Sequence, residues 1–129
     1  MDRKPTILCV DDDPFFGELY RQALEPKGYD VAVAQDAPEG FEMAKSLKPD
    51  LIILDVMMPE KGGFKDGFEL LDRLRHEGPC TTTPIVMISA IGGPDDVRHG
   101  KSLGATDYLA KQNMVPENLL ALVKKLVSG

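Results

Sequence analysis

Short apolar runs rich in β-branched residues alternate along this chain with segments whose apolar residues recur at helical spacing. The runs expected to be strands are Thr6–Val10, Asp30–Ala34, Leu51–Leu54, Pro84–Ser89 and Thr106–Ala110. The expected helices run from Pro14 to about Glu25, between Asp36 and Pro49, and over Gly67–His76, Pro94–Leu103 and Pro116–Val127. Because helical crossovers join parallel strands, the pattern predicts an α/β fold of the (βα)₅ type with right-handed crossovers.

The length and composition fit one soluble domain. With 129 residues the chain can bury one proper core but not two, so we expect a single domain over residues 1–129. Apolar residues make up 43% of the chain and charged residues 28%, the balance of a globular protein. No apolar run could span a bilayer, and the N-terminus lacks the apolar region of a signal peptide. We therefore expect a cytoplasmic protein without membrane contact.

The cysteines and the net charge limit the cellular compartment and the kinds of partner that we expect. Cys9 lies in a predicted strand and Cys80 in a polar loop, so we expect no disulfide, which fits a reducing compartment. The formal net charge of −6 argues against direct binding of nucleic acid by this domain.

Aspartates follow the first and third predicted strands. Asp11 and Asp12 come directly after the first, and Asp55 after the third. Ligands of an open parallel sheet bind beyond the carboxyl ends of its strands, where the strand order reverses. In the flavodoxin-like order 2-1-3-4-5 the first and third strands are neighbours, and the three carboxylates would meet. They would repel one another unless a hard divalent cation lay between them, and Mg²⁺ suits such donors.

The fourth and fifth predicted strands end in a hydroxyl and an ammonium group. Ser89 can donate a hydrogen bond to an anionic oxygen, and Lys111 carries a compact positive charge suited to phosphate. Catalysis of phosphoryl transfer is mostly positioning and charge neutralisation. One edge of the predicted sheet thus combines a metal-binding acidic cluster, a hydroxyl donor and a cation, as that chemistry requires.

Five motifs in order resemble the receiver domain family of response regulators, which belong to two-component signalling systems, over essentially the whole chain. They are VDDDP at Val10–Pro14, LIILDVMMP at Leu51–Pro59, DGFELL at Asp66–Leu71, PIVMISA at Pro84–Ala90 and GATDYLAK at Gly104–Lys111. The resemblance implies a flavodoxin-like three-layer sandwich whose five-stranded parallel sheet has the order 2-1-3-4-5. It also implies a regulatory domain, not an enzyme, which catalyses only its own phosphoryl transfer and slow self-dephosphorylation.

The resemblance implies a role for each matching residue. Asp55 is similar to the phosphoacceptor, a carboxylate nucleophile that forms an aspartyl phosphate with Mg²⁺ as cofactor. Asp12 resembles the direct metal ligand, and Asp11 the acid that acts largely through a metal-bound water. By the same resemblance, Asp55 is also a metal ligand, and the backbone carbonyl of Met57 is the last ligand from the protein.

The same resemblance implies which residues hold the phosphoryl group and which partners donate it and respond to it. Ser89 and Lys111 match the residues that hold the phosphoryl oxygens. Tyr108 matches the switch aromatic, expected to turn inward when Ser89 moves, although it could be an ordinary strand residue. The donor would be a phosphohistidine on a sensor histidine kinase or a histidine phosphotransfer protein. A downstream protein, an attached output domain or a second copy would read the face formed by helix four, strand five and helix five.

Some positions depart from the family's pattern or vary within it. Gln112 stands where the family usually has a proline, so the Lys111–Gln112 bond is either trans with a rearranged loop or cis. Met57 and Ile91 are apolar at positions that tune phosphoryl lifetime and cannot orient an attacking water. They predict slow self-dephosphorylation.

The loop after the third strand is also longer than usual. Residues Glu60–Lys65 lie between Pro59 and Asp66, about four more than is common, and loops tolerate such insertions. The insertion is either a neutral surface feature or a partner contact centred on Phe64, with Lys61 or Lys65 nearby.

The first predicted helix has ordinary structural interpretations. Asp13 precedes Pro14 and is expected to cap this helix, not to bind a metal. Its inner face is expected to contain Phe15, Leu19 and Ala23, with Phe16 as a further candidate.

Two other functions are possible for a chain with this predicted fold. A nucleotide or flavin binder of the same fold would need a glycine-rich phosphate loop after the first strand, where this chain has acids. A degenerate receiver would bind its partner constitutively without phosphorylation. Only Gln112 favours that alternative, and the intact set of acids, Ser89 and Lys111 argues against it.

Overall fold

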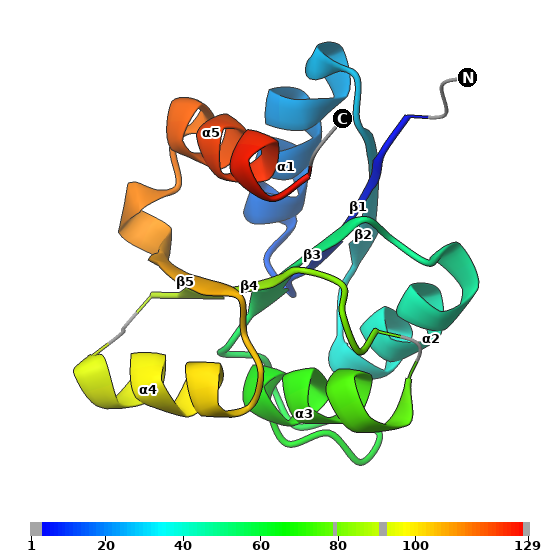
Figure 1. Ribbon diagram of the computed structural model, residues 1–129, viewed down its shortest axis with the longest axis vertical. Helices are drawn as coiled ribbons and strands as arrows, with labels where there is room; N and C mark the ends of the chain where they lie inside the picture. Colours follow the sequence, from blue (N-terminus) through cyan, green and yellow to red (C-terminus); the bar gives the residue numbers. More distant parts are fainter. Residues whose placement is uncertain (1–3, 79, 91–92, 128–129) are drawn as a thin grey trace.

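A parallel sheet lies between two layers of helices in the computed structural model, which describes residues 4–78, 80–90 and 93–127 (Figure 1). The strands are β1 (Thr6–Val10), β2 (Asp30–Ala34), β3 (Leu51–Asp55), β4 (Ile85–Ser89) and β5 (Asp107–Ala110). The helices are α1 (Pro14–Leu24), α2 (Ala37–Leu47), α3 (Gly67–Glu77), α4 (Pro94–Ser102) and α5 (Pro116–Leu126). All neighbouring strands are parallel, in the order β2-β1-β3-β4-β5. The predicted fold class and strand order are confirmed.

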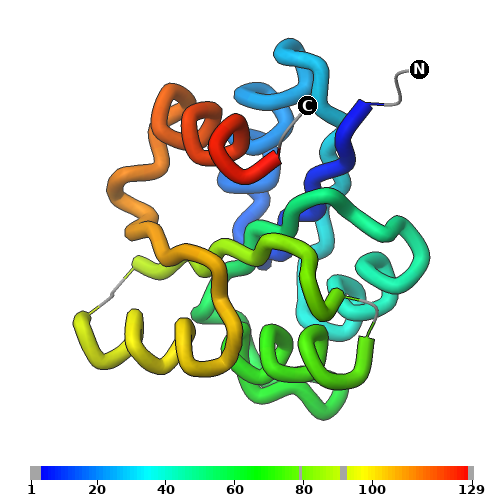
Figure 2. The backbone as a smooth tube through the Cα atoms, in the orientation of Figure 1, coloured from blue at the N-terminus to red at the C-terminus, as the bar shows by residue number. Residues whose placement is uncertain are grey.

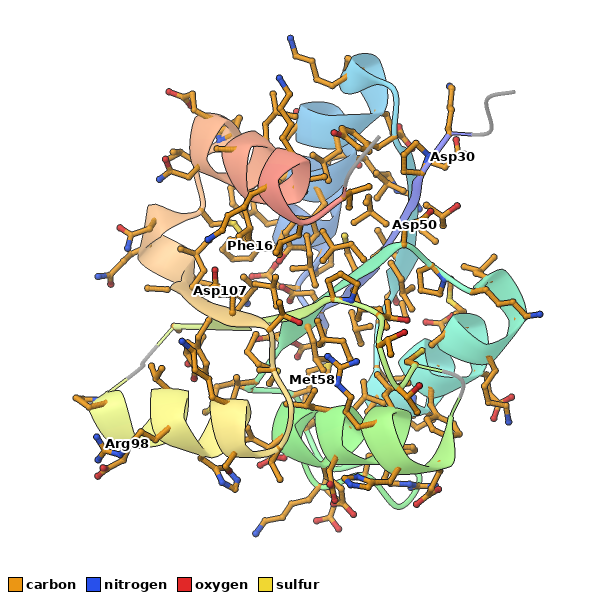
Figure 3. The ribbon with its side chains drawn as sticks, in the orientation of Figure 1. Phe16, Asp30, Asp50, Met58, Arg98 and Asp107 are labelled. Carbon is orange, nitrogen blue, oxygen red and sulfur yellow. The ribbon has the colours of Figure 1, made fainter. Side chains whose placement is uncertain are left out.

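Each face of the sheet has its own helical layer and its own core. Helices α1 and α5 cover one face, and α2, α3 and α4 cover the other (Figures 1 and 2). Because side chains alternate along a strand, Ile7 and Cys9 of β1 pack toward α1 and α5, whereas Leu8 and Val10 pack toward α2 and α3. Figure 3 shows side chains between the sheet and the helices on both of its faces. The central strands are therefore apolar on both faces, and the buried polar residues Asp11, Asp55 and Ser89 lie at or just beyond their carboxyl ends.

Aspartates begin three of the helices. The side chains of Asp13, Asp36 and Asp66 accept hydrogen bonds from backbone N–H groups in the first turns of α1, α2 and α3. The predicted cap at Asp13 is confirmed, and its carboxylate accepts the N–H of Phe15 at 2.9 Å. This cap starts α1 directly beyond the end of β1, so the first residues after the strand stay at the edge of the sheet.

The inner face of α1 agrees with the prediction in part, because Phe16, Leu19 and Ala23 are partly buried against the core and Phe15 is not. Phe15 is 68% exposed, whereas Tyr20 and Leu24 are fully buried against the sheet. Gly17 packs close to Val33 of β2, which turns the side of the helix containing Gly17, Tyr20 and Leu24 inward. The expected inward position of Phe15 is therefore wrong, because the close approach at the glycine sets the rotation of the helix.

The long loop after β3 folds back onto the domain. Lys61 and Phe64 form an antiparallel bridge around Gly62 and Gly63, whose φ angles of 57° and 86° suit glycine. The ammonium group of Lys61 lies 2.9 Å from the carboxylate of Asp36, the cap of α2. The loop is thus a short hairpin attached to the start of α2.

Phe64 is 4% exposed and lies in the core between α2 and α3. Its ring centroid is 5.7 Å from that of Phe41, and the guanidinium of Arg73 lies 4.1 Å from the Phe64 ring. A partner contact centred on Phe64 is therefore wrong, because the side chain is already enclosed by its own domain.

The structure also answers the questions about the Lys111–Gln112 bond, the two cysteines and membrane-spanning helices. No peptide bond in the described ranges is cis, so the Lys111–Gln112 bond is trans, and Lys111–Asn113 forms a 3₁₀ turn, η2. Cys9 and Cys80 are unpaired and buried, and Cys80 is not exposed in its loop. Among the described helices, none combines the length and the apolar character needed to cross a membrane.

Candidate functional site

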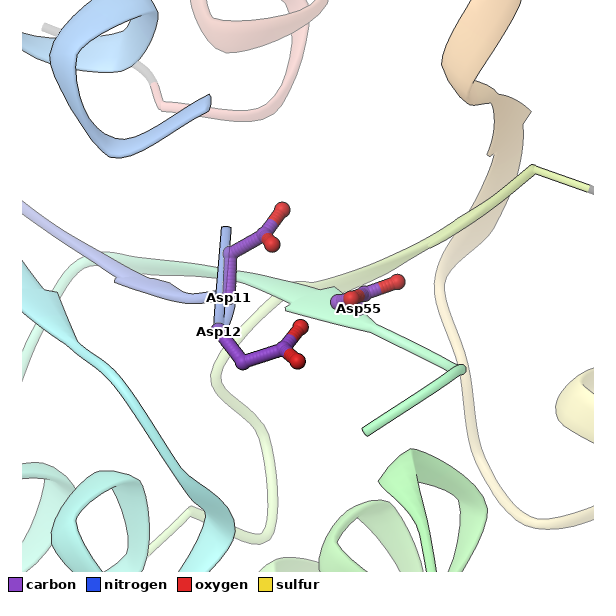
Figure 4. A group of neighbouring side chains, drawn as sticks. All are labelled: Asp11, Asp12 and Asp55. Carbon is purple, nitrogen blue, oxygen red and sulfur yellow. The ribbon is translucent and has the colours of Figure 1, made fainter. Parts of the chain in front are cut away.

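Three aspartates lie side by side where β1 and β3 end (Figure 4). Asp11 and Asp12 follow β1, Asp55 ends β3, and the sheet order makes these strands neighbours. One carboxylate oxygen from each residue lies within 4.8 Å of the others. Asp11 and Asp55 are buried and Asp12 is exposed, so the cluster opens to solvent on one side. Its geometry and hard oxygen donors fit a divalent cation such as Mg²⁺.

Lys111 reaches this cluster from the end of β5. Its ammonium nitrogen lies 3.3 Å from Oδ2 of Asp11 and 3.4 Å from Oδ2 of Asp55. The same nitrogen lies 4.3 Å from the ring centroid of Phe16 on α1. Burial lowers the pKa of Lys111, but Asp11 and Asp55 outweigh this effect and raise it overall, so the lysine stays charged. The trans bond to Gln112 does not prevent the lysine from reaching the acids.

The two buried carboxylates are electrostatically strained. Burial, and then the charge of Asp11, raise the pKa of Asp55 against the opposing effects of Lys111 and the N–H of Met57. Burial also raises the pKa of Asp11, although the N–H of Asp13, Lys111 and other donors oppose it. A single lysine therefore does not compensate the buried acids, and additional positive charge would stabilise their ionised forms.

Both oxygens of Asp11 have fixed donors. The backbone N–H of Asp13 donates to Oδ1 at 3.0 Å, and the buried hydroxyl of Tyr20 donates to Oδ2 at 3.2 Å. Sequence reasoning missed Tyr20. The available signal was a tyrosine within the apolar pattern of α1, because a buried tyrosine hydroxyl usually needs a partner.

Ser89 and Tyr108 lie on the neighbouring strands β4 and β5. Ser89 is 1% exposed and lies one residue beyond Ile88, the register partner of Asp55. The Tyr108 ring packs against Gly100 of α4, where an added Cβ would lie 3.3 Å from the ring. Within the described chain the Tyr108 hydroxyl is a buried polar atom without a hydrogen bond. Burial raises the pKa of Tyr108, while the nearby Ser89 hydroxyl opposes the change.

Met57 lies at the rim of the site. Its backbone N–H donates to Oδ1 of Asp55 at 3.3 Å, and its side chain is 63% exposed. Ile91, predicted to act together with Met57 on phosphoryl lifetime, lies outside the described residues. The described site thus brings together Asp11, Asp12, Asp55 and Lys111, with Met57, Ser89 and Tyr108 on the adjoining segments.

The sequence model of the response regulator receiver domain family matches residues 7–124 of the chain. The chain belongs to this family. Its receiver domain is 42% identical over 123 residues to the DNA-binding dual master transcriptional regulator RpaA of Synechocystis sp., covering 95% of this chain and 49% of RpaA. It is 39% identical over 121 residues to the alkaline phosphatase synthesis transcriptional regulatory protein PhoP of Bacillus subtilis, covering 94% and 48%. The chain thus spans about half the length of these relatives.

Solved structures of similar sequence have the same fold. The receiver domain superposes on the chemotaxis protein CheY4 of Vibrio cholerae with a TM-score of 0.87 and 31% identity, covering 96% of this chain and 99% of CheY4. It superposes on the BeF3-activated N-terminal receiver domain of Klebsiella pneumoniae RstA with a TM-score of 0.83 and 31% identity, again covering 96% and 99%.

Proposed function

We propose that this receiver domain accepts a phosphoryl group on Asp55 in a Mg²⁺-dependent step of a two-component phosphorelay. The observation that carries the proposal is the position of the Asp55 carboxylate, which is buried between Asp11 and Lys111 at the edge of the sheet. An oxygen of Asp55 attacks the phosphorus of a phosphohistidine on a sensor histidine kinase or a phosphotransfer protein. The new P–O bond forms as the P–N bond breaks, and the released imidazole takes the electron pair and a proton.

The neighbouring residues prepare this step by neutralising charge. Asp11, Asp12, Asp55 and the carbonyl of Met57 would hold Mg²⁺, which when bound compensates the negative charge of the phosphoryl oxygens. The ammonium group of Lys111 lies between the carboxylates of Asp11 and Asp55 and can donate instead to a phosphoryl oxygen. The intact set of groups favours this function over a degenerate receiver that binds without phosphorylation.

The output is proposed to pass through Ser89 and Tyr108. An aspartyl phosphate adds about 1.5–2 negative charges beside β4, and the Ser89 hydroxyl can donate to its oxygens. Movement of Ser89 would change the surroundings of the Tyr108 hydroxyl and, through the ring, the contact with Gly100 of α4. The face formed by α4, β5 and α5 would then be read by a downstream protein, an attached output domain or a second copy of the domain. We assign any DNA contact to such an output domain, not to this acidic one.

The test is phosphorylation with acetyl phosphate followed by intact mass measurement. The wild type should gain one phosphoryl group with Mg²⁺ and none with EDTA. Asp55→Asn should gain none, whereas the control Asp30→Asn, at the opposite end of the strands, should behave like the wild type. Absence of the phosphoryl group in the wild type, or its persistence in Asp55→Asn, would refute the proposal.

A further inference from the structure

Two aromatic side chains of helix α1, one turn apart, contact the charged residues of the site. Phe16 lies under the ammonium group of Lys111, and Tyr20 donates its hydroxyl hydrogen to Oδ2 of Asp11 at 3.2 Å. Tyr20 is 1% exposed, so its hydroxyl lies beyond the reach of bulk water. The hydrogen bond to Asp11 therefore connects the hydrophobic core to the acidic cluster.

We propose that Tyr20 is a positioning residue that orients the Asp11 carboxylate for the divalent cation, an inference that rests on the proposed function. With Oδ1 held by the N–H of Asp13 and Oδ2 by Tyr20, the carboxylate plane has one preferred orientation. The remaining acceptor sites of Asp11 stay available toward Asp12 and Asp55. Donors behind metal-binding side chains commonly act in this way.

A phenol suits this position because it adds a donor without adding a charge. A second cation behind Asp11 would compete with the metal for the carboxylate, as Lys111 already does at 3.3 Å. An apolar side chain at position 20 would leave Oδ2 dependent on Lys111, the group that must leave the acids to reach a phosphoryl oxygen. Tyr20 thus keeps Asp11 in place while Lys111 moves.

The variant Tyr20→Phe removes the hydroxyl and keeps the ring in the core. It should also leave the contact between Phe16 and Lys111 intact, so the lysine should stay in the site. The matched control is Tyr29→Phe, which removes the same group just before β2, at the other end of the sheet from Asp11. Urea unfolding of both variants with EDTA measures any general loss of stability.

The decisive measurement is Mn²⁺ affinity, determined from the electron paramagnetic resonance signal of the free ion. We expect Tyr20→Phe to bind Mn²⁺ about 10–100-fold more weakly than the wild type, and Tyr29→Phe to bind as the wild type does. The Mg²⁺ concentration for half-maximal phosphorylation should rise by a similar factor, while the extent at saturating Mg²⁺ stays unchanged. Equal Mn²⁺ affinity of the wild type and Tyr20→Phe would overturn the proposal.

A double-mutant cycle separates positioning from a structural effect. In an Asp11→Asn background, Tyr20→Phe should change Mn²⁺ affinity little, because the carboxylate through which it acts is gone. An equal loss in both backgrounds would overturn the role of Tyr20 and leave the proposed function intact. If the wild type itself neither bound Mn²⁺ nor accepted a phosphoryl group, the proposed function would fail and this inference with it.

Discussion

Replacing Asp55 with asparagine should stabilise the metal-free domain at neutral pH, although it removes the proposed phosphoacceptor. The Asp55 carboxylate is 2% exposed, and burial together with the charge of Asp11 raises its pKa from 3.8 to about 7. A carboxyl group whose pKa is higher in the folded than in the unfolded state favours folding less once it is ionised. The wild type should therefore lose stability as the pH rises from about 4 to about 7, and Asp55→Asn should lose less.

The pKa of Asp55 sets the upper limit of this effect. A rise from 3.8 to about 7 corresponds to about 4 kcal/mol between the protonated and the ionised site. The asparagine amide can no longer pair with Lys111, 3.4 Å from the present carboxylate, and this loss offsets part of the gain. We therefore expect Asp55→Asn to be about 1–3 kcal/mol more stable than the wild type above neutral pH.

Urea unfolding with EDTA from about pH 4 to about pH 8 measures the difference. The two proteins should have similar stability at the acidic end and separate as the pH rises. Saturating Mg²⁺ should stabilise the wild type far more than Asp55→Asn, while the exposed Asp30→Asn should follow the wild type throughout. A stability difference independent of pH, or a less stable Asp55→Asn at the alkaline end, would contradict the electrostatic argument.

Four further substitutions test the site and the packing around it. Phe64→Ala should cost about 3–5 kcal/mol in urea unfolding because it empties a buried position, whereas Phe15→Ala, at an exposed position, should cost under about 1 kcal/mol. Gly67→Ala should destabilise the domain by about 1–3 kcal/mol and slow labelling by acetyl phosphate, because a Cβ would overlap the backbone carbonyl of Asp55. Met57→Asn should shorten the lifetime of the phosphorylated domain, measured by intact mass over time, because an exposed amide beside the site can orient water. An unchanged lifetime would contradict the predicted role of Met57.

The fold and the acidic site were predictable because each depends on a strong local signal. β-branched runs such as that of β3 form buried parallel strands, and the residues that follow them must lie at one edge of the sheet. The order of the strands came from the family resemblance and not from composition or periodicity. Given that order, the meeting of Asp11, Asp12 and Asp55 followed directly from the positions of the strand ends.

The rotation of α1 and the path of the long loop could not be read from the sequence. Apolar residues occur in adjacent pairs along α1, so two neighbouring stripes fit helical spacing equally well. Only the packing of Gly17 against β2 selects the stripe that contains Tyr20. Likewise, an aromatic residue in a glycine-rich loop resembles an exposed contact until the hairpin at Gly62 and Gly63 turns Phe64 into the core.

The most direct measurement locates the acyl phosphate within the chain. The domain is treated with acetyl phosphate and Mg²⁺ and then with sodium borohydride, which reduces an aspartyl phosphate to homoserine. Peptide mass spectrometry should find homoserine at position 55 alone, with unmodified aspartate at positions 11 and 12. Homoserine at another aspartate, or its absence from a protein that is folded and binds Mn²⁺, would contradict the assignment of Asp55 as the phosphoacceptor.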